Sequence, residues 1–332
     1  MTKRTSERPE EAAAGTRAVG AVGGSVPGNS GAAAFSHSAP RSMPLPVLIA
    51  VPHAGRAYSA DLLARMRDPA LSQLRLEDRH VDKVAVEIAR ATGTGLLLAH
   101  APRAMLDLNR AEDDIDWGMV KGEGDTQSLP MPTQRKAGKA GANKRAQSGL
   151  GLVPRRLPGF GEIWREPMTR EQLDDRIEAI HRPYHSFLEQ ELARIRDAWG
   201  AALLVDLHSM PPLRRSTHGG PRARIVLGDR FGASCDAGLV EQAFGYLERQ
   251  ACAAAHNRPY SGGYVLDRHA APRRGIHALQ VELCRSTYLD RAFSEPSEGL
   301  TPIATMLAGL VRVLGAATAR LAENERFLQA AE

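Results

Sequence analysis

Apolar runs and amphipathic stretches alternate along most of the 332-residue chain. Short, almost wholly apolar runs that end in polar or turn-forming residues are typical of buried strands. Such runs lie at residues 47–51, 95–101, 201–205, 223–230 and 277–286. Stretches with the spacing of an amphipathic helix lie between or after them. This alternation predicts an α/β fold, with a mixed, mostly parallel twisted sheet and helices on both faces.

Three helical stretches carry further signals. In residues 75–93 the apolar side chains fall on one stripe, and Gly93 stands where a C-cap is expected. Residues 168–200 begin with a T-x-x-Q capping box and predict a long helix, or a helix pair, interrupted near Pro183. Residues 300–328 predict a closing helix of period 3.6.

Two segments lack any hydrophobic period. Residues 1–44 are rich in Ala, Gly, Ser and Pro, which predicts a disordered low-complexity tail. Residues 118–150 are rich in Gly, Lys and Ala, which predicts a mobile basic insertion. The remainder, residues 45–330, is expected to form a single catalytic domain.

The net charge of +5 is concentrated in these two segments. Residues 121–156 carry eight Lys or Arg against two acidic residues, so the body of the protein is mildly acidic. A basic pI that comes from loose segments is weak support for nucleic-acid binding, and we predict no nucleic-acid partner. Oligomeric state is not predicted from the sequence.

Composition also bears on location. We see no apolar run of about 18 residues or more, and the N-terminus lacks the apolar core of a signal peptide. The three cysteines show no C-x-x-C spacing, which argues against a disulfide framework and a cysteine-ligated zinc site. We therefore expect a cytoplasmic protein that does not contact a membrane.

Polar side chains gather at or near the carboxyl ends of the predicted strands, where ligands bind in open α/β sheets. They are His53, Arg103, Asp107, Asn109, Arg110, His208 and Glu282. Two histidines at one rim suggest a metal, since catalytic zinc takes three protein ligands and a water. Asp206 would then orient a histidine through its second ring nitrogen. The alternative is that each histidine only caps a strand end.

Other hydrolytic chemistries have little support. The chain has no G-x-S-x-G elbow, phosphate loop, G-x-G-x-x-G fingerprint or H-E-x-x-H motif. Ser209 should not form a triad with its neighbour His208, because adjacent residues of a strand point to opposite faces. Cys284 lies in an apolar strand, where a packing role is more common than a nucleophilic one.

Six motifs together resemble the N-formylglutamate amidohydrolases. They are VPHAG, DRHVD, RAMLDLNR, VDLHSMP, VLGDR and GIHALQVELCRSTY, in that family's order and spacing. The segments GLVPRRLPGFGEIWREP and HRPYHSFLEQEL also look like the family's middle region. The resemblance spans about residues 46–295.

The resemblance implies a relative of the zinc carboxypeptidases and aspartoacylases, with one zinc on an α/β sheet. His53 and His208 would be two of its ligands. The carboxypeptidase pattern H-x-x-E is not kept, because residue 56 is arginine. Asp78 is the favoured third ligand and Asp82 the second choice.

The resemblance also implies roles for four other residues. Asn109 and Arg110 would bind the substrate carboxylate, Arg103 would stabilise the oxyanion, and Glu282 would be general base and acid. The alternatives are surface ion pairs between the arginines and Asp113, Asp114 or Asp116, and a structural ion pair between Glu282 and Arg285. His277 would line the pocket or belong to the core.

The expected reaction is hydrolysis of the N-formyl amide of N-formyl-L-glutamate to formate and L-glutamate, a step of histidine degradation. One alternative is a zinc deacylase acting on another N-acyl amino acid or a small peptide. Another is an inactive homologue that binds without catalysis.

Overall fold

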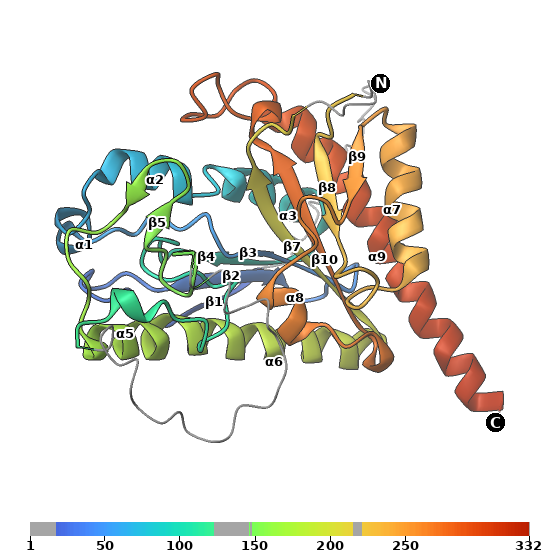
Figure 1. Ribbon diagram of the computed structural model, residues 1–332. Coiled ribbons are helices and arrows are strands. Elements are labelled where there is room, and N and C mark those ends of the chain that lie inside the picture. Colours follow the sequence, from blue (N-terminus) through green and yellow to red (C-terminus); the bar gives the residue numbers. More distant parts are fainter. Residues whose placement is uncertain (1–17, 123–145, 147, 215–220, 332) are drawn as a thin grey trace, which may run out of the picture.

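The computed structural model describes residues 18–122, 146, 148–214 and 221–331, and an eight-stranded sheet runs through this part of the chain (Figure 1). The strands are β1 (Ala18–Gly23), β2 (Phe35–Pro40), β3 (Val47–Val51), β4 (Gly95–Ala99), β7 (Ala202–Met210), β8 (Ile225–Gly228), β9 (Ala254–His256) and β10 (Ile276–Cys284). Their order is β1-β2-β4-β3-β7-β10-β8-β9. The four central strands, β4, β3, β7 and β10, are parallel. The predicted mixed, mostly parallel α/β fold is confirmed.

Helices cover both faces of this sheet. The longer ones are α3 (Val81–Thr92), α6 (Arg182–Trp199), α7 (Ala237–Arg249) and α9 (Leu300–Ala331), and the shorter ones are α1 (Ala60–Ala64), α2 (Pro69–Leu76), α5 (Arg170–Arg176) and α8 (Tyr264–His269). One core cluster joins α3, α7 and α9 to side chains such as Leu203, Val205 and Leu207 of β7. A second joins α6 and α8 to Ala202 and Leu204, on the opposite face of the same strand. The period-2 alternation of β7 therefore divides the core into two layers.

The first two strands overturn part of the predicted tail. β1 and β2 form an antiparallel hairpin, and β2 pairs with β4 at the edge of the main sheet. Alternate side chains of β2 (Phe35, His37 and Ala39) are buried. The hairpin carries little apolar signal in the sequence, because β1 (AVGAVG) and β2 (FSHSAP) consist mostly of small and polar residues. Residues 1–17 lie outside the described part of the chain.

The predicted basic insertion at 118–150 falls mostly on residues 123–145, which also lie outside the described part. Its two ends belong to the fold. A 3-10 helix (Trp117–Met119) begins it, and both Met119 and Val120 are buried, as is Ala146. The boundaries predicted from composition are therefore too wide.

Two of the predicted helical stretches are each divided into shorter segments. The stretch 75–93 divides into α2 and α3, with residues 77–80 non-helical between them and Gly93 in the left-handed region as predicted. In the stretch 168–200 the capping box is present at the start of α5. A π-helical segment (Ile177–His181) then leads into α6, and Pro183 lies in the first turn of α6, where proline is tolerated.

Helix α9 is long and apolar enough to cross a membrane by length and composition alone, with a mean hydropathy of 1.6 over an 18-residue window of Leu300–Glu323. Half of that window is buried inside the protein, where residues such as Ile303, Leu307 and Val311 pack in the same cluster as α3 and α7. This is the pattern of a core helix that covers a sheet.

The hairpin can be tested by stability. Phe35 is 2% exposed and its ring lies 5.8 Å from that of Tyr184 and 5.3 Å from that of Phe187. Phe35→Ala should lower the free energy of unfolding by about 3–5 kcal/mol, measured by denaturant titration, because it leaves a cavity. Val22→Ala, at a position 75% exposed, should change it by less than about 0.5 kcal/mol. Equal, small effects of both substitutions would show that the hairpin is not part of the folded sheet.

Candidate active site

Strands β7 and β10 together supply a row of polar side chains on one face of the sheet. β7 continues to Met210, beyond the predicted run 201–205, so Asp206 and His208 belong to the strand itself. In the parallel register of the two strands Glu282 lies opposite His208, and Gln280 lies opposite Asp206. The apolar residues between them face the α9 layer. Consequently four polar side chains share the other face near the carboxyl end of the sheet.

The loop after β3 brings His53 to the same edge. Gly55 in this loop passes so close to the end of β4 that a Cβ atom there would lie 2.1 Å from the carbonyl oxygen of Ala101. The Asp78 amide donates a hydrogen bond of 2.9 Å to the carbonyl of His53. The non-helical break between α2 and α3 is therefore fixed directly to the backbone of the histidine.

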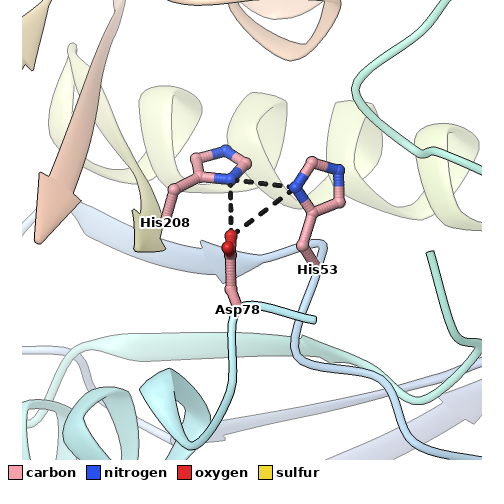
Figure 2. Close-up of side chains that lie close together, drawn as sticks. All are labelled: His53, Asp78 and His208. Atoms are coloured by element: carbon pink, nitrogen blue, oxygen red, sulfur yellow. Dashed lines mark hydrogen bonds and ion pairs between the residues drawn. The ribbon is translucent and has the colours of Figure 1, made fainter. Parts of the chain in front are cut away.

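His53, Asp78 and His208 form a compact buried group (Figure 2). His208 Nδ1 lies 3.1 Å from His53 Nδ1 and 3.1 Å from Asp78 Oδ2. His53 Nδ1 lies 3.6 Å from the same carboxylate oxygen. One potential ligand atom from each residue lies within 4.8 Å of the others, a spacing that could hold a metal ion. Figure 2 shows the two imidazoles and the carboxylate turned toward a common point.

Each histidine has a carboxylate behind it. His53 Nε2 lies 2.7 Å from Asp107 Oδ1, and His208 Nε2 lies 2.9 Å from Asp206 Oδ2. An ionised carboxylate only accepts hydrogen bonds, so each Nε2 carries a hydrogen, and in a neutral ring Nδ1 keeps its lone pair. Two lone pairs and a carboxylate oxygen facing one another require a positive charge between them. The ligand set therefore fits a metal cation.

The charges around His208 support the same conclusion. Burial opposes a charge on this ring, but Asp206 and Asp78 outweigh it and raise the pKa of His208 well above its ordinary value. Burial also opposes ionisation of Asp78, yet the two histidines hold the pKa of this carboxyl well below its usual range. The point between these groups thus favours positive charge, whether a proton or a metal ion carries it.

The second oxygen of Asp78 is also held. Ser209 Oγ donates to Asp78 Oδ1 at 3.2 Å, and Arg285 lies 3.4 Å from the same oxygen. The Ser209 hydroxyl is thus a hydrogen-bond donor to Asp78. The carboxylate that orients His208 is that of Asp206. The second-choice ligand, Asp82, is paired with Arg56 at 2.6 Å near the surface and is not in the group. Arg56, which stands where H-x-x-E would place a glutamate, therefore has a structural partner.

A cavity of about 400 Å³ opens beside the group. Its lining includes the predicted site residues His53, Asp78, Arg103, Asn109, Arg110, His208 and Glu282. Glu282 accepts a hydrogen bond of 2.9 Å from Gln280, and burial raises the pKa of Glu282 to about 7. Arg285 bonds to the carbonyl oxygens of Leu74 and Glu77, besides Ser209 and Asp78. The alternative ion pair between Glu282 and Arg285 is absent from the described contacts.

The predicted arginines are fixed by their own partners. Arg103 binds Asp107 through both Nε and Nη2, at 2.9 Å each, rather than any of the three aspartates suggested as alternatives. Arg110 Nε donates to the carbonyl of Leu150 and lies 3.8 Å from Asp114, so it lines the cavity and also makes one of the suggested ion pairs. Both guanidinium groups are held at the cavity wall.

Some lining residues were not predicted. Tyr260 and Arg75 line the cavity, and Arg75 lies over the ring of Phe160 at 4.6 Å. The sequence marks Asp107 only as a polar residue of the DLNR turn, although it binds both His53 and Arg103. Tyr260 stands in a Pro- and Gly-rich loop, and that composition was its only signal. His277 accepts from the Asp236 amide and, like Cys284, is absent from the cavity lining.

Comparison with known proteins identifies the family. A statistical description of the N-formylglutamate amidohydrolases matches residues 45–289. The chain belongs to the N-formylglutamate amidohydrolase family. It is 30% identical over 276 residues to N-formylglutamate deformylase of Pseudomonas putida, covering 81% of this chain and 92% of that protein. It is 29% identical over 254 residues to N-formylglutamate deformylase of Pseudomonas aeruginosa, covering 74% and 83%.

One solved structure agrees with this family assignment, and a second shares the fold. The crystal structure of N-formylglutamate amidohydrolase from Ralstonia eutropha JMP134 matches with a TM-score of 0.69 and 31% identity, over 88% of this chain and 98% of that one. A gene product of Agrobacterium tumefaciens matches with a TM-score of 0.59 at 17% identity, over 83% and 92%, and shares the fold. The resemblance drawn from six sequence motifs is confirmed.

The geometry predicts which aspartate matters for metal binding. Asp78→Asn should lower the affinity for a divalent metal at least about tenfold, because it removes the anionic ligand. Asp82→Asn, its matched control outside the group, should leave metal content unchanged. Metal per chain is measured by elemental analysis after dialysis against a dilute chelator. Loss of metal from the Asp82 variant alone would overturn the assignment.

Proposed function

We propose that this protein is a zinc-dependent amidohydrolase that converts N-formyl-L-glutamate to formate and L-glutamate. The observation that carries the proposal is the buried group of His53, Asp78 and His208, with Glu282 opposite His208 in the same cavity. Membership of the family and the two Pseudomonas deformylases support the choice of substrate. The products would place the reaction in histidine degradation.

His53, Asp78 and His208 would hold one zinc ion per chain. Two imidazoles and a carboxylate are a common ligand set of catalytic zinc, which keeps its remaining position for water or substrate. When bound, zinc supplies a Lewis acid that polarises the formyl carbonyl and makes a water molecule more acidic. Asp107 and Asp206 would fix the tautomer and orientation of the two ligand rings.

Glu282 would move the protons. Directly opposite residues on paired strands are neighbours, about 4.8 Å apart, so Glu282 stands next to His208. A carboxyl with a pKa of about 7 can both accept and release a proton near neutral pH. It would take a proton from the water as the new C–O bond forms, and give it to the amine nitrogen as the C–N bond breaks.

Arg103 would stabilise the charge that develops on the formyl oxygen. Burial opposes the charge of this guanidinium, but Asp107 raises the pKa of Arg103 above its ordinary value, so the side chain stays positive. Its bonds to Asp107 also hold it in place before the substrate arrives. A fixed donor needs no reorganisation during the reaction, which is the basis of oxyanion stabilisation.

Asn109 and Arg110 would bind a substrate carboxylate. Both line the cavity, and a guanidinium matches the geometry of a carboxylate with two parallel hydrogen bonds. Asn109 Oδ1 is occupied by the amide of Val265, and its Nδ2 makes only a long bond of 3.4 Å to Gln280. The Asn109 amide group would therefore present its NH₂ to the substrate.

A second candidate function keeps this chemistry on another N-acyl amino acid or a small peptide. A volume of about 400 Å³ is at the lower end of the range for ligand pockets, and it has room for acyl groups larger than formyl. The third candidate, an inactive binding homologue, is disfavoured because the ligand group, Glu282 and Arg103 stand together in one cavity.

The role of Glu282 predicts a loss of turnover. Glu282→Gln should lower kcat on N-formyl-L-glutamate by about 10²–10⁴-fold, while zinc content stays at the parent level. Glu295→Gln, at a side chain 65% exposed, is the control and should keep the parent kcat. The kcat of both variants is measured by the release of formate. An active Glu282→Gln enzyme would exclude this residue as the general base.

The role of Arg110 predicts a loss of substrate binding. Arg110→Gln should raise KM for N-formyl-L-glutamate by about 10- to 100-fold, because a charge-assisted pair is lost. Arg170→Gln, on an exposed side chain paired with Asp174, is the matched control.

A panel of N-formyl and N-acetyl amino acids identifies the acyl group that the enzyme prefers. Better turnover of an acetyl substrate would favour the second candidate function.

A further inference from the structure

The motif HRPYH places two histidines behind the turn that carries Asn109 and Arg110. His181 ends the π-helical segment, and His185 lies one turn further along α6. Both are 0% exposed, and their ring centroids lie 4.4 Å apart. Neither lines the cavity. They therefore contact the turn from the protein interior, while the side chains of Asn109 and Arg110 face the substrate space.

Each histidine binds one carbonyl of the turn. His185 Nε2 donates to the carbonyl of Leu108 at 3.0 Å, and His181 Nε2 donates to the carbonyl of Arg110 at 2.9 Å. These two carbonyls stand immediately before and at the end of the Asn109–Arg110 pair. Between them, the backbone N–H of Asn109 donates a hydrogen bond of 2.8 Å to Asp107 Oδ1. The backbone of the pair is thus fixed at both ends.

Helix α8 closes this arrangement into a ring of contacts. At its start, the Val265 amide donates to Asn109 Oδ1 at 2.9 Å. At its end, His269 Nε2 lies 2.9 Å from His185 Nδ1, with the two rings stacked. Because His185 Nε2 must carry the hydrogen that Leu108 accepts, a neutral His185 accepts from His269 through Nδ1.

The chain of histidines from α8 to the turn is uncharged. Burial holds the pKa of His185 well below its ordinary value and lowers that of His269 to about 3. A neutral imidazole donates to a carbonyl without adding a positive charge behind Arg110. A lysine or arginine in the same place would repel the Arg110 guanidinium.

We propose that His185 and His181 are positioning residues for substrate binding, which hold the Asn109–Arg110 pair in the geometry that binds the substrate carboxylate. The inference rests on the proposed function for those two residues. The two histidines of the HRPYH motif would then act on substrate affinity, whereas histidines that only pack in the core would act on stability alone.

The experiment compares two neutral substitutions at one position. The amide nitrogen of His185→Gln extends as far as Nε2 of the imidazole and can still donate to Leu108. In His185→Asn the amide extends only as far as Nδ1 and cannot. For N-formyl-L-glutamate, His185→Asn should raise KM by about 10- to 100-fold with kcat within about threefold of the parent, and His185→Gln should restore most of the loss.

Two controls separate positioning from general loss of structure. His277→Asn removes a buried histidine outside the cavity lining; it should lower the melting temperature without changing KM. In an Arg110→Gln background, His185→Asn should add little to KM, because the residue that it positions is already gone. If His185→Asn does not fold, the same pair of substitutions at His181 carries the test.

The outcomes distinguish this inference from the proposed function. A parent enzyme without deformylase activity overturns the proposed function. With an active parent, an unchanged KM in a folded His185→Asn enzyme overturns the inference. So does a Gln variant as impaired as the Asn variant, or a fully additive effect with Arg110→Gln.

Discussion

The parallel pairing of β7 with β10 is the constraint on which the site depends. It sets Asp206 and His208 of one strand beside Gln280 and Glu282 of the other, on a single face of the sheet. A shift of either strand by one residue would turn its polar side chains into the α9 layer and its leucines toward the cavity. The apolar residues of both strands fix the register, because Leu203, Val205 and Leu207 pack in the same layer as Leu279, Val281 and Leu283.

Burial of so many polar groups at one edge requires that each be held by another. Asp107 illustrates this best, since one carboxylate binds His53, Arg103 and the Asn109 amide at once. The cost of placing its charge in the interior is offset by these bonds, which hold the pKa of Asp107 well below its usual range despite burial. The same carboxylate therefore links His53, Arg103 and the DLNR turn.

Much of this site could be predicted from particular residues. His53 and His208 follow two apolar runs, and the polar residues of the DLNR turn follow a third apolar run. Because ligands bind at the carboxyl ends of strands in open α/β sheets, these residues were expected at one edge. The edge hairpin could not be predicted, because its Gly, Ala and Ser residues carry no apolar period. Nor could the length of β7, since its last residues are polar on the cavity side and resemble the start of a loop. The choice between Asp78 and Asp82 was open for a similar reason: both stand near the start of a helix.

The sequence by itself determined the α/β fold, the family, and the residues that gather around the cavity, because apolar runs and spaced motifs are properties of the chain alone. The tertiary structure alone decided how these residues contact one another. It placed Asp78 between two imidazoles through a hydrogen bond to the backbone of His53, and left Asp82 with Arg56. It also placed His181 and His185 behind the DLNR turn. These contacts join residues far apart in sequence, so their distances follow from how helices and strands pack and not from the pattern within any one of them.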